Sequence, residues 1–137
     1  MSKVFVDTAA WLALVNRDDD LHSQAIQIRK KLQTEKSALV TTEFIFLEVA
    51  DALAAVRFRH ATVVYIQRLR ELANLSVLPI SEELYNRGWQ LYRQRLDKDW
   101  GLTDCISFVA MDQESISVAF TSDRHFEQAG FKKLLNP

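Results

Sequence analysis

The chain has 137 residues, of which 48% are hydrophobic and 26% charged, and its formal net charge at pH 7 is −1. This length and composition suit a single globular domain over residues 1–137, which can bury its core without disulfides or a structural metal. The near-neutral charge excludes a basic surface extensive enough to indicate a nucleic-acid partner by itself.

The first predicted elements are a strand and a helix. Residues 3–6 are mostly β-branched and aromatic and predict a strand that ends at Asp7, and residues 8–15 predict the helix after it. An acid after so short an apolar run does not fit a secretory signal peptide, and no stretch approaches the roughly 20 apolar residues that cross a bilayer. We therefore expect a cytoplasmic protein with no membrane segment.

The middle of the chain continues in the same way. A helix over residues 22–35 precedes a short buried strand at residues 39–40. The next helix is expected from about residue 43 to residue 58, and it is apolar nearly all round. A further helix over residues 61–73 leads to a third strand at residues 77–78. Each predicted strand is therefore followed by one or two helices.

The last part of the chain repeats this alternation. Its predicted elements are a helix over residues 81–96, an apolar helix over residues 103–114, a strand at residues 118–120, a short helix over residues 123–129 and a possible last strand at residues 133–135. Strands that alternate with helices form a parallel sheet with right-handed crossovers. The sequence thus predicts a three-layer α/β fold, with a central parallel β-sheet of about four to five short strands flanked by helices.

Two acidic residues fall where predicted strands end. Asp7 follows the first strand, and Asp123 comes shortly after Phe120. In open α/β sheets, ligands bind outside the carboxyl ends of the strands. We therefore expect both side chains at the same edge of the sheet.

Two further acids lie in apolar helices. Glu48 sits in the middle of the helix over residues 43–58, where a buried carboxylate is costly unless it is paired, hydrogen-bonded or bound to a metal. Asp104 lies at the start of the helix over residues 103–114, and the N-terminal end of a helix favours negative charge. Four acids are thus expected to converge.

Carboxylates in one pocket repel one another and need a cation, unless their pKa values rise. Oxygen ligands suit a hard ion, so Mg²⁺ is expected and Mn²⁺ can replace it, whereas the single cysteine, Cys105, has no Cys/His spacing of the zinc type around it. Phosphodiester hydrolysis by a metal-activated water is the chemistry that follows. The hydroxyls of Thr8 and Thr103, each beside one of the acids, are expected to hydrogen-bond a metal-bound water or a phosphate.

Each acid also has a purely structural interpretation. Asp7 and Asp104 lie where a helix cap or first turn accounts for an acid, and Asp123 fits a turn. Glu48 fits an ion pair with one of the arginines. The three histidines are scattered and are expected at the surface or in packing; they are His22, His60 and His125.

The segments around the acids resemble the motifs of the PIN-domain family, and in particular of the VapC-type toxins of bacterial toxin–antitoxin pairs; they are residues 4–11, 41–49, 102–107 and 120–126. The resemblance covers essentially the whole chain. It implies a PIN-like fold whose metal-binding or metal-orienting residues are Asp7, Glu48, Asp104 and Asp123. It also implies a magnesium-dependent endoribonuclease that cuts structured RNA such as tRNA, works as a homodimer and is held inactive by a cognate antitoxin.

Other families that begin with a strand and an aspartate fit less well. A phosphatase of the haloacid-dehalogenase type needs a second acid two residues after the first, where this chain has Ala9. A receiver-like phosphotransfer domain needs adjacent acids before its first helix and a lysine after a late strand, and neither is evident. A PIN fold that serves only as an RNA-processing or assembly module stays open, because only a cleavage assay with and without EDTA separates it from the enzyme.

Overall fold

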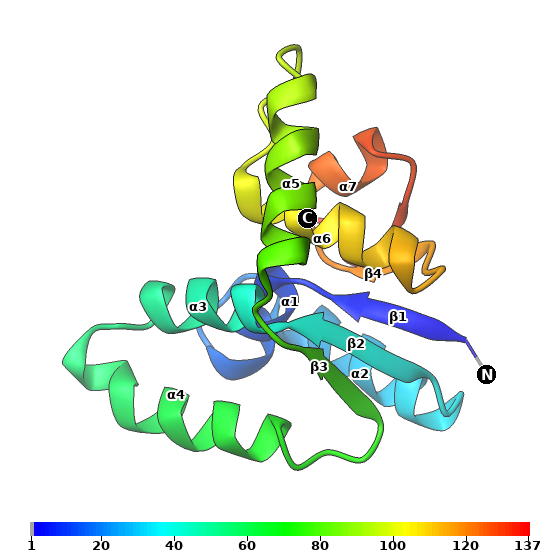
Figure 1. Ribbon diagram of the computed structural model, residues 1–137. Helices are drawn as coiled ribbons and strands as arrows, with labels where there is room; N and C mark the ends of the chain where they lie inside the picture. The colour runs from blue at the N-terminus through cyan, green and yellow to red at the C-terminus, as the bar shows by residue number, and fades with distance from the viewer. Residues whose placement is uncertain (1) are drawn as a thin grey trace.

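The computed structural model describes residues 2–137 and contains a parallel sheet in the strand order β3-β2-β1-β4-β5 (Figure 1). The strands are β1 (Lys3–Val6), β2 (Ala38–Thr42), β3 (Leu75–Leu78), β4 (Val118–Phe120) and β5 (Lys132–Lys133). β1 lies at the centre and pairs with β2 on one side and with β4 on the other. The predicted α/β class with a parallel sheet of short strands is confirmed.

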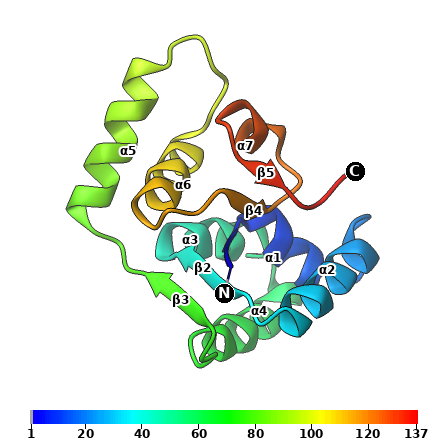
Figure 2. The same cartoon turned by 90° about the vertical axis from the view of Figure 1, so that its right-hand side faces the viewer.

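Helices connect the strands and cover both faces of the sheet; they are α1 (Thr8–Val15), α2 (His22–Thr34), α3 (Glu43–Ala52), α4 (Val56–Leu69), α5 (Glu82–Gln94), α6 (Leu102–Gln113) and α7 (Arg124–Gln128). Figure 2 shows α1, α2 and α4 on one side of the sheet and α5 and α6 on the other, which gives three layers. Within residues 2–137, none of the helices is long and apolar enough to cross a membrane.

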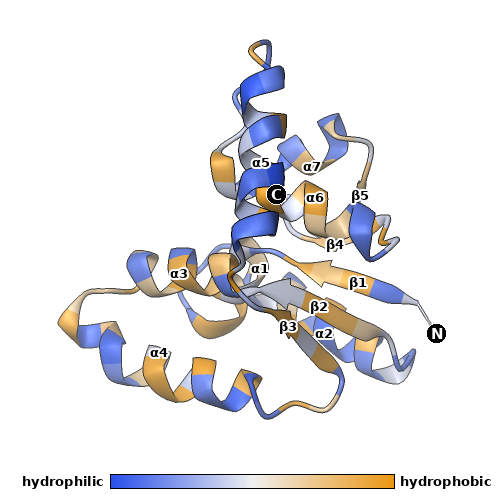
Figure 3. Cartoon of the chain, in the orientation of Figure 1, coloured by the Kyte–Doolittle hydropathy of each residue, from blue (hydrophilic) through white to orange (hydrophobic). Residues whose placement is uncertain are grey.

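Apolar side chains fill the core on both faces of the central strands. Phe5 on β1 and Phe120 on β4 have exposed fractions of only 0% and 2%. Most of α5 is hydrophilic, in contrast to the strands of the sheet (Figure 3). It packs against α6 where Gly88 meets Ile106, and a Cβ atom at Gly88 would overlap the Ile106 side chain. The absence of a side chain at Gly88 therefore permits the close approach of these two helices.

The predicted ends of the two helices after β2 are wrong. The helix expected over residues 43–58 ends at Ala52, and the helix expected from residue 61 begins at Val56. Leu53 takes the C-cap position and is buried. The chain turns there without a glycine or a proline, so the sequence contains no stop signal. The short α3 lies beyond the carboxyl end of β2 (Figure 1).

The register between β1 and β4 decides which residues meet at the carboxyl edge of the sheet. Val6 lies opposite Phe120, and the backbone N–H of Asp7 donates to the carbonyl oxygen of Phe120 at 3.1 Å. The residues that follow, Asp7 and Thr121, are therefore at the same level. This pairing confirms that the segment containing Asp123 leaves the sheet at the same edge as Asp7.

Candidate metal centre

Asp7 is the most buried acid of the described residues, with an exposed fraction of 6%. Its Oδ2 accepts a hydrogen bond of 2.8 Å from the hydroxyl of Thr121. Burial raises the pKa of Asp7 to about 7, and the nearby carboxyls of Asp104 and Glu48 add to this effect, while the hydrogen bond from Thr121 opposes it. A carboxyl with such a raised pKa is a candidate functional group, because a cation beside it would relieve the cost of its charge.

Glu48 reaches the site from α3, but its side chain is exposed, so the expected burial of this carboxylate is wrong. α3 is shorter than predicted, and one side of it faces solvent, as the 54% exposed Leu47 also indicates. The hydroxyl of Thr8 donates to Oε1 of Glu48 at 2.6 Å. This hydrogen bond joins the first turn of α1 to α3 and keeps Glu48 on the side of Asp7.

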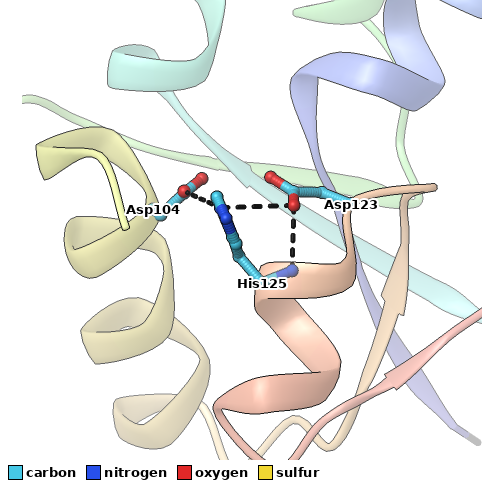
Figure 4. Close-up of side chains that lie close together, drawn as sticks. All are labelled: Asp104, Asp123 and His125. Carbon is cyan, nitrogen blue, oxygen red and sulfur yellow. Dashed lines mark hydrogen bonds and ion pairs between the residues drawn. The ribbon is translucent and has the colours of Figure 1, made fainter. Parts of the chain in front are cut away.

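His125 lies between the carboxylates of Asp104 and Asp123 (Figure 4). Its Nδ1 atom is 3.1 Å from Oδ2 of Asp104 and 3.3 Å from Oδ1 of Asp123. One ligand atom from each of the three residues lies within 4.8 Å of the others. Ligands of an octahedral Mg²⁺, at about 2.1 Å from the ion, are about 3.0 to 4.2 Å apart, so this group of three residues is a candidate cation site.

Asp104 and Asp123 also close the ends of helices. Oδ2 of Asp104 accepts from the backbone N–H of Gly101 at 3.2 Å, and Oδ1 of Asp123 accepts from the backbone N–H of His125 at 2.9 Å. The structural interpretation of these two acids therefore holds beside the metal-binding one. Asp7, the N-cap residue of α1, makes no such capping hydrogen bond with its side chain. Among the three aspartates, Asp7 is thus the one whose carboxylate is not explained by helix capping.

The electrostatics of Asp104 point to the same need for a cation. Burial, followed by repulsion from Asp123, raises the pKa of Asp104, whereas the hydrogen bond with His125 lowers it. Carboxylates that are partly desolvated and repel one another are stabilised when a divalent ion binds between them. The donor set of carboxylate oxygens with one imidazole therefore fits a divalent metal.

Two residues of this site are missing from the sequence-based set. The expectation that His125 is a surface or packing residue is wrong, since its ring contacts both aspartates. Thr121 is fully buried and joins two acids, because its hydroxyl donates to Asp7 and accepts from the backbone N–H of Asp123 at 3.1 Å. The position of Thr121, a polar residue directly after an apolar strand, was the sequence signal that could have identified it. Thr103 makes no side-chain hydrogen bond within residues 2–137, so its predicted role has no contact to support it.

Comparison with known proteins adds independent findings. A family model described as PIN domain matches residues 4–132. The "23S rRNA-specific endonuclease VapC20" of Mycobacterium tuberculosis, in strains CDC 1551 / Oshkosh and ATCC 25618 / H37Rv, is 28% identical over 128 residues, which cover 93% of this chain and 95% of that protein.

Solved structures resemble the fold over nearly its whole length. The crystal structure of M. tuberculosis VapC20, described as a sarcin-ricin loop cleaving toxin, matches with a TM-score of 0.82 and 25% identity and covers 98% of this chain and 99% of that chain. VapBC2 from Rickettsia felis, bound to a DNA fragment from their promoter, matches with a TM-score of 0.68 at 10% identity. FitAcB from Neisseria gonorrhoeae matches with a TM-score of 0.67 at 16% identity. The last two matches cover 96% of each chain and show a likeness of fold alone.

Proposed function

The chain belongs to the PIN-domain family, and from this premise we propose that it is a metal-dependent endoribonuclease that serves as the toxin of a toxin–antitoxin pair. The observation that carries the proposal is the cluster at the carboxyl edge of the sheet: ligand atoms of Asp104, Asp123 and His125 lie within 4.8 Å of one another, and the carboxyls of Asp104 and Glu48 are near enough to raise the pKa of Asp7. The similarity to VapC20, which is named as an rRNA-specific endonuclease, supports RNA as the substrate. Such a substrate would place its action in the cytoplasm.

The metal in this proposal is Mg²⁺, with Mn²⁺ as a substitute, held by Asp7, Asp104 and Asp123. Carboxylate oxygens are the ligands that these ions prefer. When bound, such an ion lowers the pKa of a water and stabilises charge on the phosphate oxygens.

The chain's own residues would prepare this site. Thr121 fixes one oxygen of the Asp7 carboxylate, and His125 holds Asp104 and Asp123 at a fixed spacing. The hydroxyl of Thr8 orients Glu48, whose exposed carboxylate is open to the substrate and to the attacking water. Carboxylates that are already oriented reorganise little when the reaction begins, which is the main source of electrostatic catalysis.

A cleavage assay tests the proposal. Protein freed of any inhibitor should cut RNA with Mg²⁺ or Mn²⁺ and should stop in excess EDTA. Asp104→Asn should abolish cutting, whereas Asp112→Asn, an exposed position on the same helix, should leave it unchanged. Full activity in EDTA, or in Asp104→Asn, would refute the proposal. RNA binding without cleavage at any metal concentration would favour the alternative, a PIN-fold module for RNA processing or assembly.

The resemblance to VapC-type toxins also supports a cognate antitoxin as partner. Expression of the chain alone should then arrest bacterial growth, and coexpression of the antitoxin should relieve the arrest. Asp7→Asn should not arrest growth, because the toxicity is catalytic. Equal arrest by the wild type and by Asp7→Asn would contradict the toxin proposal while leaving nuclease activity to the cleavage assay.

We also propose that the chain forms a homodimer. Tyr85, Trp89 and Tyr92 lie on one side of α5 with exposed fractions of 44%, 46% and 42%, and the rings of the last two stack at 5.6 Å. Aromatic side chains are enriched in the buried centres of protein interfaces. Light scattering should give a dimer for the wild type and a monomer for Trp89→Ser, and a monomeric wild type would contradict this part.

A further inference from the structure

A cavity separate from the acidic site lies between α2 and α4. Its volume is about 240 Å³, and its floor is formed by α1 and by the sheet face that α5 and α6 do not cover (Figure 2). Most of the wall is apolar and includes Trp11, Leu32 and Leu69. These three side chains have exposed fractions of 3%, 7% and 6%, so the wall is part of the core rather than of the surface.

Arg29 of α2 is the only charged residue that lines this cavity within the described part of the chain. Its Nε atom is buried and has no hydrogen-bond partner. Its guanidinium forms no ion pair with any carboxylate of residues 2–137. A buried donor without a partner is costly, and a guanidinium has donors on one edge in a geometry that matches a carboxylate. The cavity therefore combines an apolar body with a guanidinium at its wall whose Nε donor has no partner.

The size of the cavity limits what it can hold. An apolar cavity of about 150 Å³ takes up benzene, so about 240 Å³ leaves room for one ring and a short chain. Tyr65 lines the same space, and burial raises the pKa of its phenol to about 12, so the hydroxyl stays a neutral donor. Cation, phenol donor and apolar wall together match a ligand with one apolar group and one acid group.

We propose that this cavity binds a small amphipathic carboxylate, with the carboxylate on the guanidinium of Arg29 and the apolar group between Trp11, Leu32 and Leu69. The binding uses two complementary parts. Transfer of the apolar group from water into the cavity supplies affinity, and the charge-assisted hydrogen bonds to Arg29 supply the preference for an acid. The proposal is independent of the nuclease function, since none of the acids of the metal centre lines this cavity.

The test compares two ligands of the same shape, 3-phenylpropionate and 3-phenylpropanamide. Calorimetry gives the dissociation constants, and tryptophan fluorescence, to which Trp11 in the cavity wall contributes, follows binding. The acid should bind at least about tenfold more tightly than the amide to the wild-type chain. In Arg29→Gln the acid should lose this preference, whereas Lys30→Gln, which removes an exposed charge from the same helix, should keep it.

Each outcome decides the proposal. Equal binding of acid and amide to the wild type, binding of neither, or an unchanged preference in Arg29→Gln would overturn it. If Arg29→Gln does not fold, NMR of the wild type supplies the answer, because the Nε–H resonance of Arg29 should move with the acid and not with the amide. A resonance that moves equally with both ligands, or with neither, would again overturn the assignment.

Discussion

Replacement of Asp7 by asparagine should stabilise the metal-free protein at high pH. Asparagine has the shape of the protonated aspartic acid, and its side-chain oxygen can still accept the hydrogen bond from Thr121. The substitution removes a charge that the folded chain must otherwise hold in a buried place. The gain in the free energy of unfolding is therefore set by the pKa of Asp7.

The sign and size of this effect follow from linkage. The pKa of Asp7 is about 7 in the folded chain, against an ordinary value of 3.8. Between these two values the unfolded chain has released the proton and the folded chain has kept it, so the free energy of unfolding of the wild type falls as pH rises. One pKa unit corresponds to about 1.4 kcal/mol, so the free energy of unfolding falls by about 4 kcal/mol in total. This fall is complete above pH 7. Below pH 4 this contribution is fully present.

Urea unfolding in EDTA at pH 4, 6 and 8 measures the effect. Asp7→Asn should match the wild type at pH 4 and exceed it by up to about 4 kcal/mol at pH 8. Asp112→Asn, an exposed acid, should follow the wild type at every pH. Addition of Mn²⁺ should stabilise the wild type at pH 8 and not Asp7→Asn, because the ion binds the ionised carboxylate. A less stable Asp7→Asn at pH 8 would refute the reasoning.

The other predictions concern single side chains of the site and of the helix contacts. Glu48→Gln should lose RNA cleavage, whereas Glu43→Gln should keep it. Because the ion pair of Glu43 is partly exposed, Glu43→Gln should lower the free energy of unfolding by at most about 1 kcal/mol. An inactive Glu43→Gln beside an active Glu48→Gln would exchange the roles of the two residues. His125→Asn should weaken Mn²⁺ binding in calorimetry more than Mg²⁺ binding, because imidazole nitrogen suits the transition metal better; equal losses would leave the histidine a hydrogen-bond partner only. Gly88→Ala should destabilise the chain by about 1–2 kcal/mol in urea unfolding, through overlap with Ile106, and unchanged stability would contradict the close packing of α5 on α6.

Positions that follow from strand order were open to prediction from the sequence. Asp7 and Asp123 stand directly or shortly after apolar strand segments, and the parallel sheet brings both to one edge. The five-residue spacing of Glu43 and Glu48 on α3 places them about 140° apart around the helix axis, so they face different sides. Glu43 accepts from Arg70 at 3.0 Å and from the backbone N–H of Ile80 at 2.8 Å, away from the contact of Glu48 with Thr8.

Features that depend on how far an element extends were not open to prediction. Glu48 was expected to be buried because a helix over residues 43–58 is apolar nearly all round, but one side of the shorter α3 faces solvent and the side chain of Glu48 is exposed. His125 enters the site only because the turn after β4 starts a helix of five residues, which places its ring between two aspartates. A lone histidine two positions after an aspartate carries no periodic signal, so sequence patterns alone favour a surface residue.

The hydrogen bond from Thr121 to Asp7 joins residues 114 positions apart, and it depends on the pairing of β1 with β4. Contacts between distant parts of a chain form late in folding, because the loop entropy must be overcome first. The acidic site is therefore assembled only when β4 has docked beside β1. A chain still emerging from the ribosome holds Asp7 and Glu48 without their partners, so the acidic site is complete only when synthesis is nearly finished.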